Sequence, residues 1–295
     1  MEEPWQVRVA SRLKRAIVTG STGFIGSHVA KRLQAEGVTV IGLARATGFD
    51  VLTDVLPLDG VDHVYHLAGL TFVPRSWHDP VSFHHVNTHG TMRVLDQCRR
   101  SGVPVTFASA YVYGMPVRLP IDERSTTKAS NPYAYSKLSA ENACRFFCEE
   151  YGARVAIVRP FNVYGPGQHH SFLIPTIVRQ VLDPSVKEIV VASLAPRRDF
   201  VYISDVVEAL LLAPCLPHAE PFNVGGGHSY SVEDIVRISL ECADVVKPYR
   251  ERREVRSNEI PDTVADINAI ERACAWRPRV DIASGINAVI ASLQP

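Results

Sequence analysis

The sequence RAIVTGSTGFIG near the start of the chain constrains the fold more than any other segment. A short apolar run rich in β-branched residues ends there in three glycines spaced three apart, Gly20, Gly23 and Gly26. An amphipathic stretch at 27–37 closes with a glycine, and residues 38–43 have the pattern of a second buried strand. This order predicts a strand–helix–strand unit whose two strands run parallel, because a helix connects them.

The glycine-rich turn has a physical use beyond joining a strand to a helix. Gly20 permits the tight turn, Gly23 lets the backbone approach a pyrophosphate, and Gly26 lets the helix pack closely on the strand. The first amide groups of the helix and the positive end of its dipole attract phosphates. Glycine turns also occur without a ligand, but the strand, helix and strand in register favour a dinucleotide site formed by Gly20, Thr22, Gly23, Phe24, Ile25 and Gly26.

Strand and helix patterns alternate along the first 160 residues. Strand patterns occur at 61–66, 103–108 and 153–158, and helix patterns occur at 80–100 and 132–151. Such alternation predicts an α/β fold of the Rossmann type, with a doubly wound parallel sheet.

The pattern loosens after residue 161, and the expected domain organisation follows from this change. Helical signals there are separated by prolines and glycines, at 171–182, 204–213 and 231–242. We expect an N-terminal tail at 1–14 and a dinucleotide-binding Rossmann domain at 15–161, to which residues near 200–224 return. Residues 162–295 are expected to form mainly a smaller C-terminal substrate-binding lobe.

Tyr133 and Lys137 stand four residues apart in the segment NPYAYSK. Asn131 fits a helix cap and Pro132 a first helical position, so the two side chains share one helix face. A cation lowers the pKa of a nearby phenol, and an acid or base works best when its pKa lies near the working pH. The pair predicts a proton-transfer device. The same spacing is common on solvated helices, and the glycine turn upstream favours the catalytic interpretation.

Several further segments, taken with these two motifs, resemble the extended short-chain dehydrogenase/reductase family. Residues 66–69 (HLAG) match the strand end that lines the cofactor, and residues 107–114 match the strand that carries the catalytic serine or threonine. Residues 159–168 and 198–205 match the nucleotide-sugar branch of that family. The resemblance extends over nearly the whole chain after residue 14.

The resemblance implies roles for individual residues. Ser109 hydrogen-bonds the substrate oxygen that Tyr133 protonates or deprotonates, and Lys137 also holds the nicotinamide ribose. Further cofactor contacts are implied for Asp50, Val51, Leu67, Ala68, Gly69 and Pro160. Substrate contacts are implied for Asn87, Tyr111, Asn162, Arg198, Arg256 and Glu259, with Arg197 as an alternative to Arg198.

The end of the second predicted strand bears on the choice of cofactor. Sites that prefer NAD usually place an acidic residue there to hold the ribose hydroxyls. Here the segment is GLAR, and Arg45 could pair with a 2′-phosphate. NADP(H) is therefore favoured, and NAD(H) stays possible because Arg45 could instead be a solvated loop residue.

The residues after Ser109 bear on the reaction. Sugar dehydratases of this branch carry an acidic residue there, but here Ala110 and Tyr111 follow, which disfavours dehydration. Segments at 165–172, 190–199 and 256–261 resemble the GDP-4-keto-6-deoxy-mannose reductase group.

This resemblance implies an NADP(H)-dependent oxidoreductase that reduces a 4-keto-6-deoxy nucleotide sugar at carbon 4, with Tyr133 as the proton donor. The GDP-linked form of the sugar is favoured. The alternative is an NAD-dependent nucleotide-sugar 4-epimerase with the same residues. A non-catalytic dinucleotide sensor is less favoured, because a sensor needs no proton donor.

Composition excludes several other classes. The formal net charge is zero, which argues against a nucleic-acid binder, and no apolar run is long enough to span a bilayer. Residues 1–14 lack the apolar core of a secretory signal, and the six cysteines form no CxxC pair, so we expect a reduced, cytoplasmic setting.

Two adjacent histidine pairs, at 84–85 and 169–170, invite a metal interpretation. Adjacent histidines do not easily chelate one ion, and no carboxylate or cysteine cluster accompanies them, so no metal site is expected. The predicted helices at 80–100 and 132–151 resemble the four-helix dimer seam of the family, which implies a homodimer.

Overall fold

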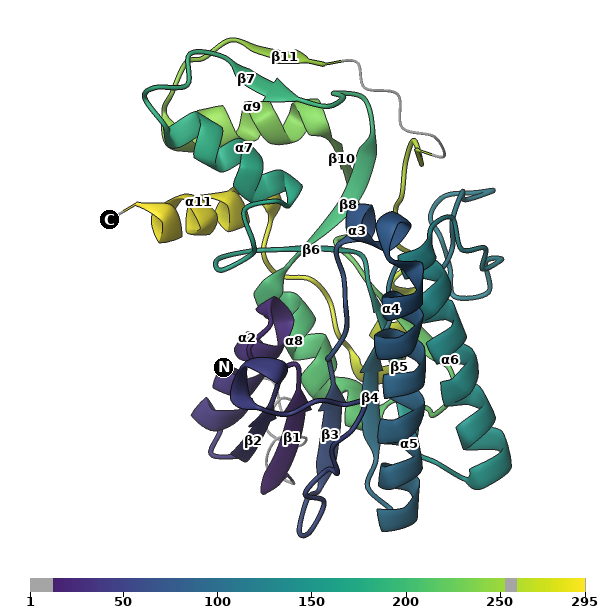
Figure 1. Cartoon of the computed structure of the whole chain (residues 1–295). Helices are drawn as coiled ribbons and strands as arrows, with labels where there is room; N and C mark the ends of the chain where they lie inside the picture. The colour runs from purple at the N-terminus through teal and green to yellow at the C-terminus, as the bar shows by residue number, and fades with distance from the viewer. Residues whose placement is uncertain (1–12, 253–258, 295) are drawn as a thin grey trace.

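Six short segments rich in β-branched residues pair into a parallel sheet at the centre of the molecule (Figure 1). The computed structural model describes residues 13–252 and 259–294. The strand order is β2-β1-β3-β4-β5-β9, and every neighbouring pair is parallel. The strands are β1 (Arg15–Thr19), β2 (Thr39–Leu43), β3 (His63–His66), β4 (Val105–Ala108), β5 (Val155–Pro160) and β9 (Pro221–Val224). The predicted Rossmann-type fold is therefore confirmed.

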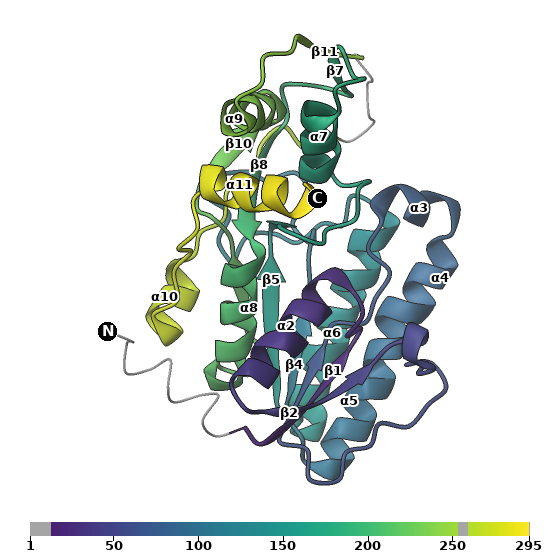
Figure 2. The same ribbon diagram turned by 90° about the vertical axis from the view of Figure 1, so that its left-hand side faces the viewer.

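Helices cover both faces of this sheet (Figure 2). On one face lie α2 (Phe24–Ala35) and α8 (Ile203–Leu212), and on the other lie α4 (Pro80–His84), α5 (Gly90–Ser101) and α6 (Pro132–Tyr151). A separate hydrophobic cluster fills each of the two helix–sheet interfaces. This two-sided burial explains why successive residues of β1, β3 and β5 are buried on both faces and show no alternation of buried and exposed positions.

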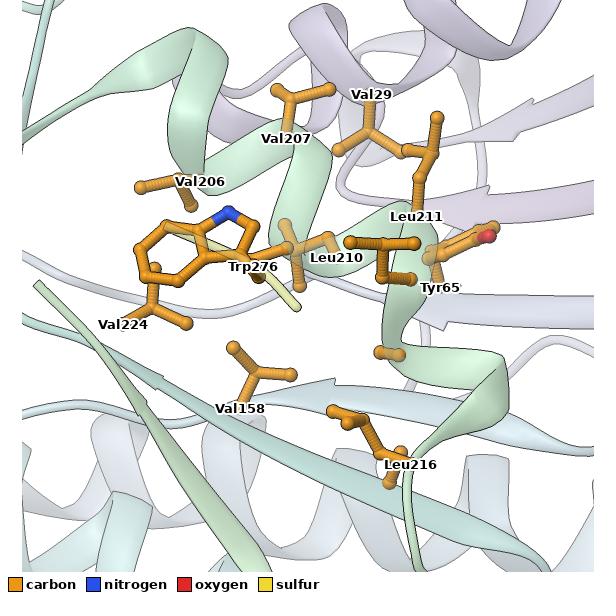
Figure 3. Packing of buried hydrophobic residues seen from close by; sticks show 14 of the residues in the cluster. Val29, Tyr65, Val158, Val206, Val207, Leu210, Leu211, Leu216, Val224 and Trp276 are labelled. Carbon is orange, nitrogen blue, oxygen red and sulfur yellow. The ribbon is translucent and has the colours of Figure 1, made fainter. Parts of the chain in front are cut away.

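The cluster on the α2 and α8 face includes a tryptophan from near the end of the chain (Figure 3). Trp276 has no exposed surface and lies beside Val206 and Leu210 of α8. Its indole Nε1 donates a hydrogen bond of 3.0 Å to the carbonyl oxygen of Asp205, so the buried N–H has a partner. The C-terminal segment thus contributes to the core of the central sheet.

The helix predicted at 80–100 is interrupted in the structure. A π-helical segment, η2 (His85–His89), separates α4 from α5. Asn87 lies within it, almost fully buried, and hydrogen-bonds the backbone of Leu70 and the hydroxyl of Ser136. These tertiary bonds hold a wider turn that the local periodicity does not indicate.

Most of the remaining chain forms a smaller lobe beyond the carboxyl ends of the central strands (Figure 1). It contains a three-stranded sheet of order β10-β8-β6 and a two-stranded pair of β11 and β7. Its strands are β6 (Asn162–Tyr164), β7 (Ile189–Val191), β8 (Arg197–Tyr202), β10 (Ser229–Ser231) and β11 (Tyr249–Glu251). Around them pack α7 (Leu173–Leu182), α9 (Val232–Ala243) and α11 (Ile282–Leu293).

Two short α-helices and two 3₁₀ turns complete the described elements: α3 (Val73–His78), α10 (Asn268–Cys274), η1 (Arg45–Thr47) and η3 (Ala213–Cys215). Because β9 belongs to the central sheet and α8 packs on its face, residues after 161 contribute to both parts of the molecule. The domain limits themselves stay a prediction. Within 13–252 and 259–294, every helix falls short of the length and hydropathy that a bilayer crossing requires.

Candidate active site

The glycine turn lies at the carboxyl end of β1, as its sequence predicts. Gly20 has a positive φ of 70°, and a Cβ on it would lie 2.8 Å from the carbonyl group of Leu67. A Cβ on Gly26 would overlap the carbonyl of Gly20, so α2 can approach the turn only without that side chain. Among the described side chains none caps the first turn of α2, and none in that turn is acidic. The first amides of α2 are therefore open to an anionic group.

A hydroxyl fixes the neighbouring loop against this turn. Thr19 Oγ1 accepts hydrogen bonds of 3.2 Å from the backbone N–H groups of Leu67 and Ala68, and it lies 2.8 Å from His66 Nδ1. Three of the predicted cofactor residues, Leu67, Ala68 and Gly69, thus line the same edge of the sheet as the glycines.

Arg45 and Asp50, both predicted to contact the cofactor, form an ion pair after β2. Arg45 Nη2 lies 3.0 Å from Asp50 Oδ2, and both side chains are partly exposed. The N–H of Leu52 and the Arg45 guanidinium keep the pKa of Asp50 below its usual range. The strand end therefore carries both the predicted cation and a carboxylate beside it. Val51 is buried in the cluster under α5, and its carbonyl accepts a bond from Arg93.

The three predicted catalytic residues lie around the carboxyl end of β4. Ser109 follows β4, and its N–H donates to the carbonyl of Val158 at 2.7 Å. Its hydroxyl is buried and has no hydrogen-bond partner among the described residues. The ammonium of Lys137 lies 4.2 Å from the ring centre of Phe107, two residues before Ser109 on the same side of the chain. Asn131 caps α6 through a 2.8 Å bond from the N–H of Ala134, as predicted.

Burial sets the protonation of the Tyr133 and Lys137 side chains. It raises the pKa of Tyr133 well above the ordinary value for a phenol, and it lowers the pKa of Lys137 to about 8. The sequence predicted the opposite shift for Tyr133, through the cation of Lys137. That prediction was wrong, because loss of solvation raises this pKa and the neighbouring Tyr111 raises it further.

Tyr111 lies directly beside Tyr133, with the two rings edge to face and 6.0 Å apart. It adopts a left-handed φ of 63°, which is rare for a bulky residue. Its hydroxyl donates to Asn162 Oδ1 at 3.0 Å, and Asn162 Nδ2 donates to the carbonyl of Asp199 at 3.0 Å. The structure thus joins two predicted substrate residues, Tyr111 and Asn162, through one hydrogen bond.

A cavity of about 70 Å³ adjoins Tyr111, which is one of its lining residues. Pro160, Asn162 and Arg198 contribute to its lining, so four of the predicted site residues meet there. Arg198 forms an ion pair with Glu259 and donates to the carbonyl of Ile260 at 2.6 Å.

Three other residues that the sequence considers for the site do not line this cavity in the described structure. The guanidinium of Arg197, the alternative to Arg198, is bonded to Ser229 and Asp234 of the lobe. Asn87 uses its side-chain amide in the bonds to Leu70 and Ser136 given above, between the 67–70 loop and α6. Arg256 lies outside the described residues. In the described part of the chain, no cluster of three or more histidine, cysteine or acidic side chains is arranged to hold a metal ion.

Sequence reasoning assigned no role to a buried polar network beneath the site. Glu141 on α6 and Arg159 on β5 form an ion pair with almost no exposure. Arg159 also donates to the hydroxyl of Tyr113, which donates in turn to Asn223 on β9. The available signal was Arg159, a charged residue in the otherwise apolar strand segment VAIVRP.

Comparison with known proteins agrees with this geometry. The model of the NAD dependent epimerase/dehydratase family matches residues 16–225. The GDP-6-deoxy-D-mannose reductase of Pseudomonas aeruginosa is 30% identical, over 94% of this chain and 96% of that protein. The UDP-glucose 4-epimerase of Azospirillum brasilense is 29% identical, over 92% of this chain and 89% of that protein.

A solved structure agrees as well. RMD from Pseudomonas aeruginosa, complexed with NADPH, superposes with a TM-score of 0.86 at 29% identity, over 95% of this chain and 98% of that one. The family match covers well over half of the chain, and it contains the glycine turn, Ser109, Tyr133 and Lys137. The chain therefore belongs to the NAD-dependent epimerase/dehydratase family of extended short-chain dehydrogenases/reductases, and it is an NAD(P)-dependent enzyme of nucleotide sugars.

Proposed function

We propose that this enzyme reduces the 4-keto group of a GDP-linked 4-keto-6-deoxy sugar, with NADPH as the reductant. The observation that carries the proposal is the environment of Tyr111. The residues that line the adjoining cavity include no carboxylate, so the acid that dehydration needs is missing from the described lining. The hydroxyl of Tyr111 is tied to Asn162, which fixes a bulky ring beside Tyr133 and restricts rotation of a sugar there. An epimerase needs that rotation.

The residues present fit a dinucleotide cofactor. The turn at Gly20 and Gly26 has no room for a Cβ, and the amides at the start of α2 are open to a pyrophosphate. Arg45 lies near the expected ribose position, where a guanidinium suits a 2′-phosphate. The nicotinamide cofactor supplies the hydride when it is bound.

Ser109, Tyr133 and Lys137 supply the remaining chemistry. The unpartnered hydroxyl of Ser109 is free to donate a hydrogen bond to the substrate carbonyl oxygen. Tyr133 keeps its proton at neutral pH because burial raises its pKa, so it can donate that proton to the oxygen as the alcohol forms. Lys137 is buried beside this group, and its ammonium stabilises the negative charge left on the phenol.

The lobe supplies the groups for the nucleotide diphosphate. Arg198 is partly buried, and Glu259 and the carbonyl of Ile260 orient its guanidinium at the edge of the cavity. A planar, oriented guanidinium suits bidentate contact with a phosphate. Arg256 is proposed as a second contact from the sequence. The GDP-linked substrate is supported by the reductase relative from Pseudomonas aeruginosa.

A second candidate, an NAD-dependent 4-epimerase of nucleotide sugars, is favoured by one observation. The carboxylate of Asp50 lies 3.0 Å from Arg45, and a negative charge there opposes a 2′-phosphate. The similarity to UDP-glucose 4-epimerase supports the same candidate.

One assay separates the two candidates. The purified enzyme is incubated with GDP-4-keto-6-deoxy-mannose and NADPH, and the absorbance of the reduced nicotinamide is followed. We expect stoichiometric loss of that absorbance and formation of one 6-deoxy sugar alcohol. In parallel, the enzyme is incubated with UDP-glucose or UDP-galactose without added cofactor. Interconversion of these two sugars, together with co-purified NAD, would replace the reductase proposal with the epimerase.

A further inference from the structure

The buried ion pair of Glu141 and Arg159 lies one helical turn from Lys137. Glu141 accepts hydrogen bonds from Arg159 Nε at 2.9 Å and from Nη2 at 2.5 Å. Neither side chain exposes more than 2% of its surface. A carboxylate in this setting attracts any nearby cation strongly, because little water screens its charge.

Lys137 and Glu141 share one face of α6, since they stand four residues apart. Even so, they form no ion pair with each other among the described side chains, and the ammonium of Lys137 lies over the ring of Phe107. The carboxylate of Glu141 is instead shared between Arg159 and the partly exposed Arg145, whose Nη2 lies 3.2 Å away. The carboxylate closest in sequence to Lys137 is thus paired with two arginines.

Arg159 is held where it stands by bonds on its other side. Its Nη1 donates to the hydroxyl of Tyr113 at 2.8 Å, and that hydroxyl donates to Asn223 Oδ1 at 2.5 Å. Asn223 is fixed by a bond from its own N–H to Glu123. The arginine is therefore braced by β9 and by the segment that follows Ser109.

The other titratable groups near Lys137 are neutral at pH 7. On β3, burial lowers the pKa of His66 to about 3. On α6, burial raises the pKa of the Cys144 thiol and of the Tyr133 phenol. Glu141 is therefore the charged neighbour that favours the ammonium form of Lys137, and Arg145 and Arg159 are both paired with that carboxylate.

We propose that Arg159 is a positioning residue of the active site, which holds the carboxylate of Glu141 so that the Lys137 ammonium faces the reaction site and does not pair with Glu141. This inference rests on the role of Lys137 in the proposed function. A buried ion pair can often be replaced by apolar residues without loss of stability. The inference gives this pair a task in the active site instead.

The two partners should have opposite effects on Lys137. In Arg159→Met, Glu141 loses its main partner and attracts Lys137, so the pKa of Lys137 should rise by roughly half a unit or more. In Glu141→Gln, Arg159 is left without its counter-charge and repels Lys137, so that pKa should fall by a similar amount. The double variant Glu141→Gln/Arg159→Met removes both charges and should return the pKa to within about 0.3 units of the wild type.

The pKa of Lys137 is read in two ways. NMR of lysine labelled with ¹³C at Cε follows its titration directly, with the resonance assigned by Lys137→Met. The alkaline limb of the kcat/KM profile for the keto sugar should move in the same direction as the NMR titration. The NMR measurement needs no turnover, so an enzyme that reduces no keto sugar would refute the proposed function and still test this inference.

A milder variant and its control keep the test decisive if Arg159→Met or Glu141→Gln leaves an unpaired buried charge that prevents folding. Arg145→Met removes the partly exposed partner of Glu141, and it should raise the pKa of Lys137 slightly without a change in Tm. Arg154→Met is the matched control, because Arg154 is exposed and bonds to the carbonyl of Gly102 at the far end of β5. Shifts of the same sign in both single variants would overturn the proposal. The proposal would also be overturned if Arg145→Met left the pKa of Lys137 unchanged and the double variant had a Lys137 pKa different from that of the wild type.

Discussion

At the scale of single residues, the environment of Tyr133 suits it to give a proton. Its hydroxyl is buried, and its pKa is raised, so it stays protonated across the physiological range. The pKa of Lys137 is lowered to about 8, so its positive charge is lost as the pH rises through that value. The reductive activity should accordingly hold at neutral pH and decline above about pH 8.

Tyr133→Phe tests the proton donor. Because Phe keeps the ring contacts with Phe83 and Tyr111 and loses only the hydroxyl, kcat should fall roughly 10²–10⁴-fold while the Kd for NADPH stays nearly unchanged. Tyr135→Phe, on the same helix but exposed, is the control and should keep full activity. Steady-state activity close to the wild type in Tyr133→Phe would show that another group donates the proton.

The Arg45 and Asp50 pair allows a two-sided test of cofactor preference. Arg45→Asp should shift the preference from NADPH toward NADH, because it removes the cation and adds a carboxylate. Asp50→Asn should strengthen the preference for NADPH, because it frees the guanidinium and keeps an oxygen for the N–H of Leu52. The ratio of kcat/KM for the two cofactors measures both effects. A wild-type enzyme that already prefers NADH would show that Arg45 has no part in the choice.

At the scale of elements, the sequence predicts a helix or strand correctly where the residues that determine its ends lie close together in the sequence. The α6 helix begins at Pro132 and ends at Tyr151, as predicted, because its cap, its first proline and the positive-φ Gly152 beyond its end are all local. The π-helical turn was missed because its bonds from Asn87 reach Leu70 and Ser136, far along the chain.

The lobe and the buried charges were harder to predict for related reasons. Strands such as β6 and β10 are three residues long, and they exist because β8 pairs with both of them. So short a segment carries no periodic pattern of its own. Glu141 and Arg159 are 18 residues apart, and their pairing depends on how α6 packs against β5. The catalytic and glycine motifs were recognisable because each is compact in sequence.

The glycine turn offers a test at this scale. Gly26→Ala places a methyl group against the carbonyl of Gly20, so the start of α2 must move. We expect a loss of stability of roughly 1–3 kcal/mol and a weaker Kd for NADPH. Ser27→Ala, one residue later in the same helical turn, is the control and should leave NADPH binding close to normal. Thermal unfolding and fluorescence titration with NADPH provide the two measurements.

At the scale of the whole molecule, one surface suggests how two copies associate. The helices α4 and α6 expose large apolar side chains on their outer faces, Val81, Tyr135, Phe146 and Tyr151, each at least half exposed. Such a patch on paired helices is typical of a protein interface. A homodimer through these helices is therefore our prediction.

Analytical ultracentrifugation tests the dimer. The wild type should sediment as a dimer at micromolar concentration, and Val81→Glu/Phe146→Glu should shift it to monomer by placing charges in the apolar interface. Val246→Glu, on a fully exposed residue of the lobe, should leave the dimer intact. A wild-type monomer throughout the concentration series would refute this prediction.

The contribution of β9 and Trp276 to the central sheet has a consequence for synthesis on the ribosome. When residue 160 has emerged, β5 is still an open edge, because its partner strand begins at Pro221. The cluster over α8 stays incomplete until Trp276 emerges, close to the end of the chain. A nascent chain therefore presents an unpaired strand edge and apolar surface while more than a hundred residues are still to be translated. Such surfaces are prone to bind other nascent chains, so we expect the edge of β5 to need protection until β9 has emerged, and the apolar surface over α8 until Trp276 has emerged.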